Sequence, residues 1–164
     1  MSTLTIETPR LTLILESTEA VLARIEEMPA EDRAQVSPVW LAQLRASAPS
    51  PWTHFLTMID RESGAHVGSC GFKGPPDADG MVEIAYGVDP EQRGRGYAKE
   101  GAAALVQFAL DHGVRLVRAH TLPDSGASDR VLMSCGFQRV GEVMDPEDGL
   151  VQRWEIVAPA PSTN

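Results

Sequence analysis

Cysteine is scarce in this sequence, which contains only Cys70 and Cys135. Two cysteines cannot build the disulfide framework that stabilises small secreted domains, so we expect both thiols to be reduced. Their spacing, and that of the four scattered histidines, matches no pattern of metal ligands. The sequence therefore predicts neither a disulfide scaffold nor a metal site.

Long hydrophobic runs are also missing. The apolar stretches are far shorter than the roughly 20 residues that span a bilayer. Residues 1–7 lack the basic and then apolar pattern of a secretion signal. We therefore expect a cytoplasmic protein that does not have a membrane as its partner.

Basic side chains are outnumbered, with 14 Lys and Arg against 23 Asp and Glu and a formal net charge of -9. Because binding to nucleic-acid phosphates requires a basic surface, nucleic acid is not an expected partner. The acidity would suit a basic acceptor such as an amine. An acidic surface that only keeps the protein soluble would have the same composition.

The 164 residues suffice for one domain with a sizeable core, and 43% hydrophobic with 23% charged residues is typical of globular proteins. We assign residues 1–158 to a single domain and expect residues 159–164 to be a frayed tail. Edge strands would permit a homodimer, but the sequence alone does not determine the oligomeric state.

The spacing of apolar residues predicts an α/β fold. Strands are expected at residues 4–15, 52–59, 67–72, 81–88, 114–122, 137–144 and 150–157. Helices are expected at residues 18–28, 31–46, 97–112 and 125–135, with Pro38 splitting or kinking the second. Strands with helices on both sides imply one sandwich around a mixed sheet.

The stretch at residues 88–102 joins a predicted strand to a predicted helix through a glycine turn. Gly94 and Gly96 let the backbone turn tightly and approach a ligand, and Arg93 and Arg95 flank them. The helix that follows offers unpaired N–H groups to an anion. The turn ends in Gly-Tyr-Ala, so it is not a nucleoside-triphosphate P-loop, and it lacks the spacing of a dinucleotide fingerprint.

Arg93, Gly96 and Ala98 match the pattern Arg-x-x-Gly-x-Ala, preceded by Glu-Ile-Ala-Tyr-Gly-Val at residues 83–88. Glu-Thr-Pro-Arg-Leu-Thr-Leu opens the chain at residues 7–13, and Ser-Asp-Arg-Val-Leu-Met-Ser-Cys-Gly-Phe occupies residues 128–137. Taken in chain order, the segments at residues 7–13, 83–98 and 128–137 resemble the GNAT superfamily of acetyl-CoA-dependent N-acetyltransferases over nearly the whole chain. The branch they resemble contains the ribosomal-protein N-terminal acetyltransferases.

This resemblance implies a mixed, mostly antiparallel central sheet with helices on both faces and splayed fourth and fifth strands. Acetyl-CoA would enter the wedge between those strands, with its pyrophosphate on the backbone N–H groups of residues 93–98. The cofactor contacts implied by position are Val88, Arg93, Gly94, Arg95, Gly96, Tyr97, Ala98 and Ser125. Independently of the family, an exposed turn with positive flanks at a helix start favours an anion.

The implied reaction is direct attack on the thioester, in a ternary complex, by a primary amine of a small molecule or a protein N-terminus. Glu83 shares a strand face with Ala85 and Gly87 and is the candidate base, although a salt-bridged or rim glutamate would give the same pattern. Ser128 is the candidate for positioning the thiol end. Leu132 stands where many relatives have a tyrosine acid, and it cannot donate a proton.

Three questions stay open at this point. A non-catalytic acyl-CoA-binding module would also keep the glycine turn and lose the acid, and a nucleotide-binding domain of another type would bind ATP or NAD. Tyr86 is an alternative acid, but an aromatic side chain on a strand is more often part of the core. His120, on the predicted fifth strand, is the histidine to examine.

Overall fold

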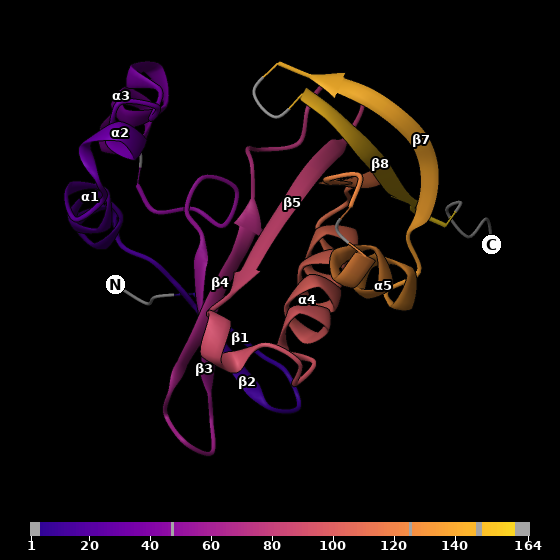
Figure 1. The fold of residues 1–164 in the computed structure, drawn as a ribbon, viewed down its shortest axis with the longest axis horizontal. Coiled ribbons are helices and arrows are strands. Elements are labelled where there is room, and N and C mark those ends of the chain that lie inside the picture. Colours follow the sequence, from indigo (N-terminus) through magenta and orange to yellow (C-terminus); the bar gives the residue numbers. More distant parts are fainter. Residues whose placement is uncertain (1–3, 47, 125, 147–148, 160–164) are drawn as a thin grey trace.

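The computed structural model describes residues 4–46, 48–124, 126–146 and 149–159. The strands are β1 (Thr5–Glu7), β2 (Leu11–Leu15), β3 (Leu56–Asp60), β4 (His66–Phe72), β5 (Met81–Val88), β6 (Leu116–Thr121), β7 (Gln138–Asp145) and β8 (Gly149–Val157). They form one eight-stranded sheet in the order β1-β2-β3-β4-β5-β6-β8-β7 (Figure 1). The pairs are antiparallel except for β5 with β6, which confirms the mixed, mostly antiparallel sheet.

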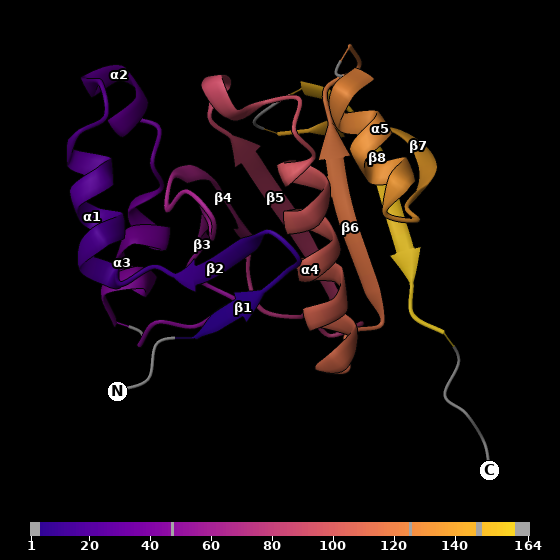
Figure 2. The same cartoon turned by 90° about the horizontal axis from the view of Figure 1, so that it is seen from below.

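The helices flank this sheet. They are α1 (Thr18–Glu26), α2 (Ala30–Arg33), α3 (Pro38–Ala46), α4 (Tyr97–Asp111) and α5 (Gly126–Ser134), with a 3-10 turn, η1 (Pro90–Gln92), before α4. Figures 1 and 2 show α4 and α5 together beside β5 and β6, while α1, α2 and α3 form a separate group toward the other end. As predicted, the segment that contains Pro38 is split, because proline starts α3 instead of continuing α2.

The main core lies between α4 and the sheet. The residues of α4 that are buried are Tyr97, Gly101, Ala102, Leu105, Val106 and Ala109. At Gly101 a Cβ atom would lie only 2.7 Å from the Met58 sulfur of β3, so this glycine lets the helix approach the sheet closely. A second, smaller cluster of Val21, Ile25 and Leu44 holds α1 against α3. The position of α4, and therefore of the turn before it, is fixed by the main core.

The pairing between β5 and β6 stops early. Only Met81, Val82 and Glu83 pair with the neighbouring strand, opposite Leu116, Val117 and Arg118. On its other side, β5 stays paired with β4 as far as Val88. Figure 2 shows β5 and β6 diverging beyond the paired segment. The predicted splay of these two strands is confirmed.

Two predicted strand boundaries were wrong. Residues 4–15 form two strands, because the chain turns at Thr8 and Pro9, with the Leu11 carbonyl accepting the Thr8 N–H at 2.9 Å. Residues 51–54 form a turn and not the start of a strand. An apolar residue stands at position 52 of this turn because the Trp52 ring packs against Phe72, with ring centroids 4.8 Å apart. The run of apolar residues thus begins before the strand β3, which starts at Leu56.

The remaining sequence-based expectations concern membranes and the chain end. Within the described ranges, no helix has both the length and the apolar character needed to cross a bilayer. Both cysteines are free. Apart from residue 159, the expected frayed tail lies outside the described residues.

Candidate functional site

A groove of about 740 Å³ lies where β5 ends, between the glycine turn, the start of α4 and one side of α5. Its lining includes seven of the residues singled out from the sequence, namely Val88, Arg93, Gly94, Gly96, Tyr97, Ala98 and Ser128. Arg95 is exposed and does not line the groove. Ser125, predicted to contact the cofactor, lies outside the described residues. The groove thus joins the glycine turn to the late helix.

The glycine turn presents bare backbone to this groove. Gly94 and Gly96 have φ angles of 79° and 83°, in the left-handed region that side chains other than glycine avoid. Gly96 is the N-cap of α4, so in the described part of the chain no side chain satisfies the first N–H groups of that helix. Unpaired N–H groups and the positive end of the helix dipole favour an anion at such a helix start.

The open edge of β5 leads into the same groove. Beyond Glu83 the backbone of β5 is unpaired on the side of β6, and Tyr86, Gly87 and Val88 line the groove. An unpaired strand edge can hydrogen-bond an extended ligand through its main chain. The groove therefore joins an unpaired strand edge to an uncapped helix N-terminus.

The start of α4 is held from outside the groove. The Tyr97 side chain is buried and donates a hydrogen bond of 2.6 Å to Asp60 at the end of β3. The Arg10 guanidinium lies 4.8 Å from the Tyr97 ring centroid and pairs with Glu100 in the first turn of α4. Thr8 donates a second hydrogen bond to Glu100, of 2.6 Å. Tyr97 thus lies at the groove mainly through its backbone.

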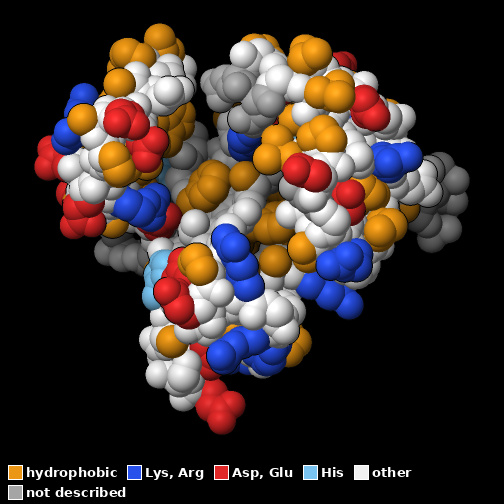
Figure 3. All heavy atoms as spheres, in the orientation of Figure 1, with side chains coloured by type: hydrophobic (Ala, Val, Ile, Leu, Met, Phe, Trp, Pro, Cys, Tyr) orange, Lys and Arg blue, Asp and Glu red, His pale blue; other side chains and the backbone are white. Residues whose placement is uncertain are grey.

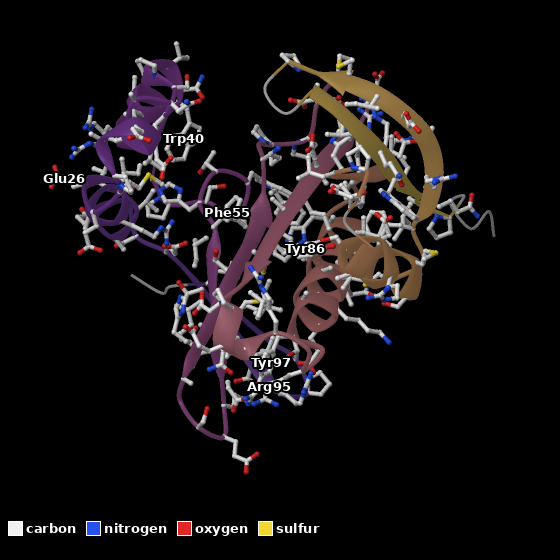
Figure 4. The ribbon with its side chains drawn as sticks, in the orientation of Figure 1. Glu26, Trp40, Phe55, Tyr86, Arg95 and Tyr97 are labelled. Atoms are coloured by element: carbon white, nitrogen blue, oxygen red, sulfur yellow. The ribbon has the colours of Figure 1, made fainter. Side chains whose placement is uncertain are left out.

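This anchor was not predictable from the motifs in the sequence. Arg10 belonged to a segment identified by resemblance only, and Asp60 and Glu100 were not singled out at all. The signal that could have found them is the excess of polar side chains in the hairpin turn at residues 8–10 and in the first turn of α4. Figure 4 shows Tyr97 and Arg95 together at the start of α4.

The Tyr97 anchor should make folding stability depend on pH. The hydrogen bond from Tyr97 holds the pKa of Asp60 below its usual value. A carboxylate with a lowered folded-state pKa stabilises the fold above its unfolded-state pKa, about 3.9, and that contribution disappears as pH falls through the folded-state value. We expect Tyr97→Phe to lower Tm at neutral pH and to flatten the fall in Tm from about pH 6 to about pH 3. Parallel Tm curves for the two proteins would contradict this.

Tyr86 brings a phenol to the groove. Its hydroxyl donates a hydrogen bond of 3.5 Å to the backbone carbonyl of Ser128 on α5. Burial raises the pKa of this phenol to about 12. It therefore keeps its proton at neutral pH and can serve as a general acid but not as a general base. Leu132, at the position of the family's usual acid, is fully buried in the core. The groove therefore holds one protonated phenol, contributed by a strand and not by α5.

Glu83 is the last residue of β5 that pairs with β6, and it lies on the face of the sheet turned away from α4. Its Oε2 accepts hydrogen bonds from Lys73 Nζ at 3.2 Å and from His120 Nδ1 at 3.0 Å. The His120 Nε2 atom lies 3.1 Å from Arg153 Nε, which can only donate. Hence Nε2 accepts, Nδ1 carries the proton, and the imidazole is neutral. Glu83 is salt-bridged, as one interpretation of the sequence held, yet its side chain is still 23% exposed.

This face of the sheet borders an open cleft. Figure 3 shows a hollow between the α1–α3 group and the β7–β8 hairpin, with hydrophobic side chains on its floor. In Figure 4, Trp40 extends from α3 toward the strands, and Phe55 and Tyr86 lie between the two halves. β5 thus carries Glu83 on the cleft side and Tyr86 in the groove.

Comparison with known proteins agrees with this geometry. Residues 7–138 match the acetyltransferase (GNAT) domain family. The uncharacterized N-acetyltransferase YjdG of Bacillus subtilis is 32% identical over 81 residues, which are 49% of this chain and 48% of that protein. The chain spans about half the length of the curated relatives it matches.

Two solved structures share the fold. Ribosomal-protein-S5-alanine acetyltransferase from Vibrio fischeri has a TM-score of 0.72 at 11% identity, covering 96% of this chain and 98% of that one. RimL, a ribosomal L7/L12 alpha-N-protein acetyltransferase in complex with coenzyme A, has a TM-score of 0.72 at 15% identity, covering 96% and 100%. With the family match over most of the chain, the splayed strands and the uncapped glycine turn, this protein belongs to the GNAT acetyltransferase domain family.

Proposed function

We propose that this protein transfers an acetyl group from acetyl-CoA to a primary amine. The observation that carries the proposal is the continuous groove from the open edge of β5 to the uncapped start of α4. The pantetheine arm would extend along residues 84–88, and the pyrophosphate would accept hydrogen bonds from backbone N–H groups of residues 93–98. Ser128, near the start of α5, would contact the arm near its thiol, and we propose that Ser125 also contacts the arm.

The reaction we propose is direct attack in a ternary complex. The neutral amine attacks the thioester carbonyl carbon from the cleft side of β5, and Glu83 accepts the proton that the amine releases. A backbone N–H on the open edge of β5 would stabilise the oxyanion. When the carbon–sulfur bond breaks, the CoA thiolate leaves and takes a proton. Tyr86 is the donor we propose, since its phenol lies in the groove beside Ser128.

A calorimetric titration tests binding, with ATP and NAD as controls. We expect acetyl-CoA alone to bind, and a screen of primary amines should then detect release of the CoA thiol. The second candidate function, a non-catalytic acyl-CoA-binding module, is favoured by Leu132 in place of the usual acid. It predicts acetyl-CoA binding without thiol release for every amine, whereas binding of ATP or NAD instead would overturn both.

Replacing Tyr86 by Phe should lower kcat about 10-fold and leave the acetyl-CoA Kd nearly unchanged. The effect is smaller than for many general acids, about 10²- to 10⁴-fold, because a thiolate leaves even without a proton. Single-turnover kinetics with Ser128→Ala as the comparison would measure it. If Ser128→Ala slows acetyl transfer more than Tyr86→Phe does, the serine and not the tyrosine is the donor.

The acceptor we propose is a primary amine of a small molecule or of a protein N-terminus, bound in the cleft. Support comes from the two solved structures, whose names give an alanine of ribosomal protein S5 and the L7/L12 alpha-amine as acceptors. Purified ribosomal proteins and small amines, offered separately in the thiol-release assay, would distinguish the two classes.

We also propose that residues 1–158 act as one domain in the cytoplasm, and that the exposed edge strand β7 can pair two copies of the chain. Val140 and Met144 on β7 are 59% and 74% exposed, which is unusual for large apolar side chains. Sedimentation equilibrium would detect the homodimer. Limited proteolysis would test whether residues 1–158 resist cleavage as one domain, and cell fractionation would test the location.

A further inference from the structure

The face of the sheet that borders the cleft carries several charged side chains. Side chains alternate along a strand, so Arg153 on β8 points away from Trp154, which is buried on the opposite face. Arg153 is directly opposite His120 on β6 in the antiparallel register, and it therefore shares the face of His120 and Glu83. Arg153 is partly buried there.

The other cations of this face have carboxylate partners. Arg118 pairs with Glu155 at 2.7 Å, and Lys73 pairs with Glu83 at 3.2 Å. Among the described residues, Arg153 has no carboxylate within ion-pair distance, and its hydrogen bond is to a neutral imidazole. This is notable in a chain with 23 acidic and 14 basic side chains. The local charge beside Glu83 is thus more positive than the acidic chain as a whole predicts.

A partly buried guanidinium without a counter-ion is unfavourable, because desolvation is not offset by an attractive charge. Arginine has five N–H donors in a planar fork that matches a carboxylate or a phosphate. Only the Nε donor of Arg153 has a hydrogen-bond partner among the described residues. Within the described ranges, the two terminal nitrogens of the fork have no partner, so they can bind a ligand.

We propose that Arg153 binds an anionic group, a carboxylate or a phosphate, on the acceptor amine. The inference rests on the proposed acetyl transfer and narrows its substrate class. Because the two ring nitrogens of His120 hydrogen-bond Glu83 and Arg153, the amine and the anionic group are separated by a short spacer, as in an amino acid or a phosphorylated amino alcohol. The acidic composition, taken alone, favours a purely basic acceptor, and the local charge on this face opposes that choice.

The test compares acceptors that differ only in the anion. Each α-amino acid is paired with its C-terminal amide, and phosphoethanolamine with ethanolamine, so that the two arms separate carboxylate from phosphate. We expect the kcat/KM of the favoured anionic acceptor to exceed that of its neutral partner by about 10- to 100-fold, the range for one charged hydrogen-bonded contact. Arg153→Gln should abolish this ratio, and Arg153→Lys should keep part of it.

Arg139→Gln is the matched control. Arg139, on the neighbouring strand β7, hydrogen-bonds Gln152, whose buried side chain lies on the opposite face from Arg153, and its replacement removes the same charge. The acid-to-amide ratio should be unchanged in this variant. Neutral amines that react as fast as their anionic partners, with a ratio that Arg153→Gln does not alter, would overturn the inference and leave the acetyltransferase proposal standing.

A failure of the proposed acetyl transfer can be distinguished from a failure of the proposed anion site. If no amine is acetylated, the proposed function is at fault, and calorimetry with the same acids and amides, in the presence of CoA, then decides the role of Arg153. Tighter binding of an acid than of its amide, lost in Arg153→Gln, supports the anion site on its own. Equal or absent binding of both overturns it.

Discussion

Glu83→Gln should lower kcat by about 10²- to 10⁴-fold, the usual effect of losing a general base, with little change in the acetyl-CoA Kd. The amide has nearly the same shape as the carboxylate but cannot accept the proton that the attacking amine releases. It also leaves Lys73 without a counter-ion at 3.2 Å. Steady-state and single-turnover assays, with calorimetry for acetyl-CoA, would measure the two effects separately.

Glu155→Gln provides the matched control for this prediction. Glu155 lies on the same face, pairs with Arg118, and is 19% exposed against 23% for Glu83. The replacement removes the same charge in similar surroundings, so kcat should stay within a few-fold of wild type. Unchanged turnover in Glu83→Gln would remove Glu83 from the mechanism but not the activity. Lost turnover with retained acetyl-CoA binding would favour an enzyme over a binding module.

Much of the fold was predictable because its signals are local. Alternating apolar residues identified β4, β5, β6, β7 and β8 with boundaries close to those observed, and proline and glycine gave the helix ends. The close approach at Gly101 also has a local signal, since a glycine inside an amphipathic helix indicates close packing on its neighbours, here the side chains of Met58 and Cys70. The glycine turn was found because its chemistry lies within a few consecutive residues.

The rest depended on strand order and register, which adjacent residues do not encode. Arg153 meets His120 only because β8 inserts between β6 and β7, bringing together residues 33 positions apart. Lys73 reaches Glu83 from the end of a neighbouring strand. The sequence could propose Glu83 as a base or as a salt-bridged residue, but the partners that orient it come from three other segments of the chain.

The direction of the Tyr97 side chain was equally inaccessible. In the sequence, Tyr97 is one residue of the predicted cofactor turn, and no neighbouring residue indicates that its hydroxyl binds Asp60. Its phenol anchors α4 to β3, so the turn is positioned by a hydrogen bond made outside the groove. Consequently a change in this anchor acts on the site through the position of the helix.

Gly96→Val should weaken acetyl-CoA binding by about 10- to 100-fold, which corresponds to the loss of one or more charged hydrogen bonds. At a φ of 83° a β-branched residue is strained, and the turn must change conformation to relieve that strain. An added Cβ would also lie 3.0 Å from the Arg10 guanidinium, which pairs with Glu100 in the first turn of α4, where we propose that the pyrophosphate binds. Calorimetric titration at a temperature where the variant is folded would measure the change in Kd.

Gly113→Val separates this local effect from a loss of stability. Gly113 follows the other end of α4 at a φ of 81°, so the backbone strain is closely matched, although an added Cβ has no atom within 4 Å there and meets the Arg10 side chain at 3.0 Å at Gly96. A helix of this length places the two glycines roughly 24 Å apart. Both variants should lose stability, by about 1 to 2 kcal/mol from strain, but only Gly96→Val should lose affinity for acetyl-CoA. Equal affinities in the two variants would mean that the pyrophosphate does not bind at this turn, and the cofactor contacts proposed for residues 93–98 would have to be moved elsewhere in the groove.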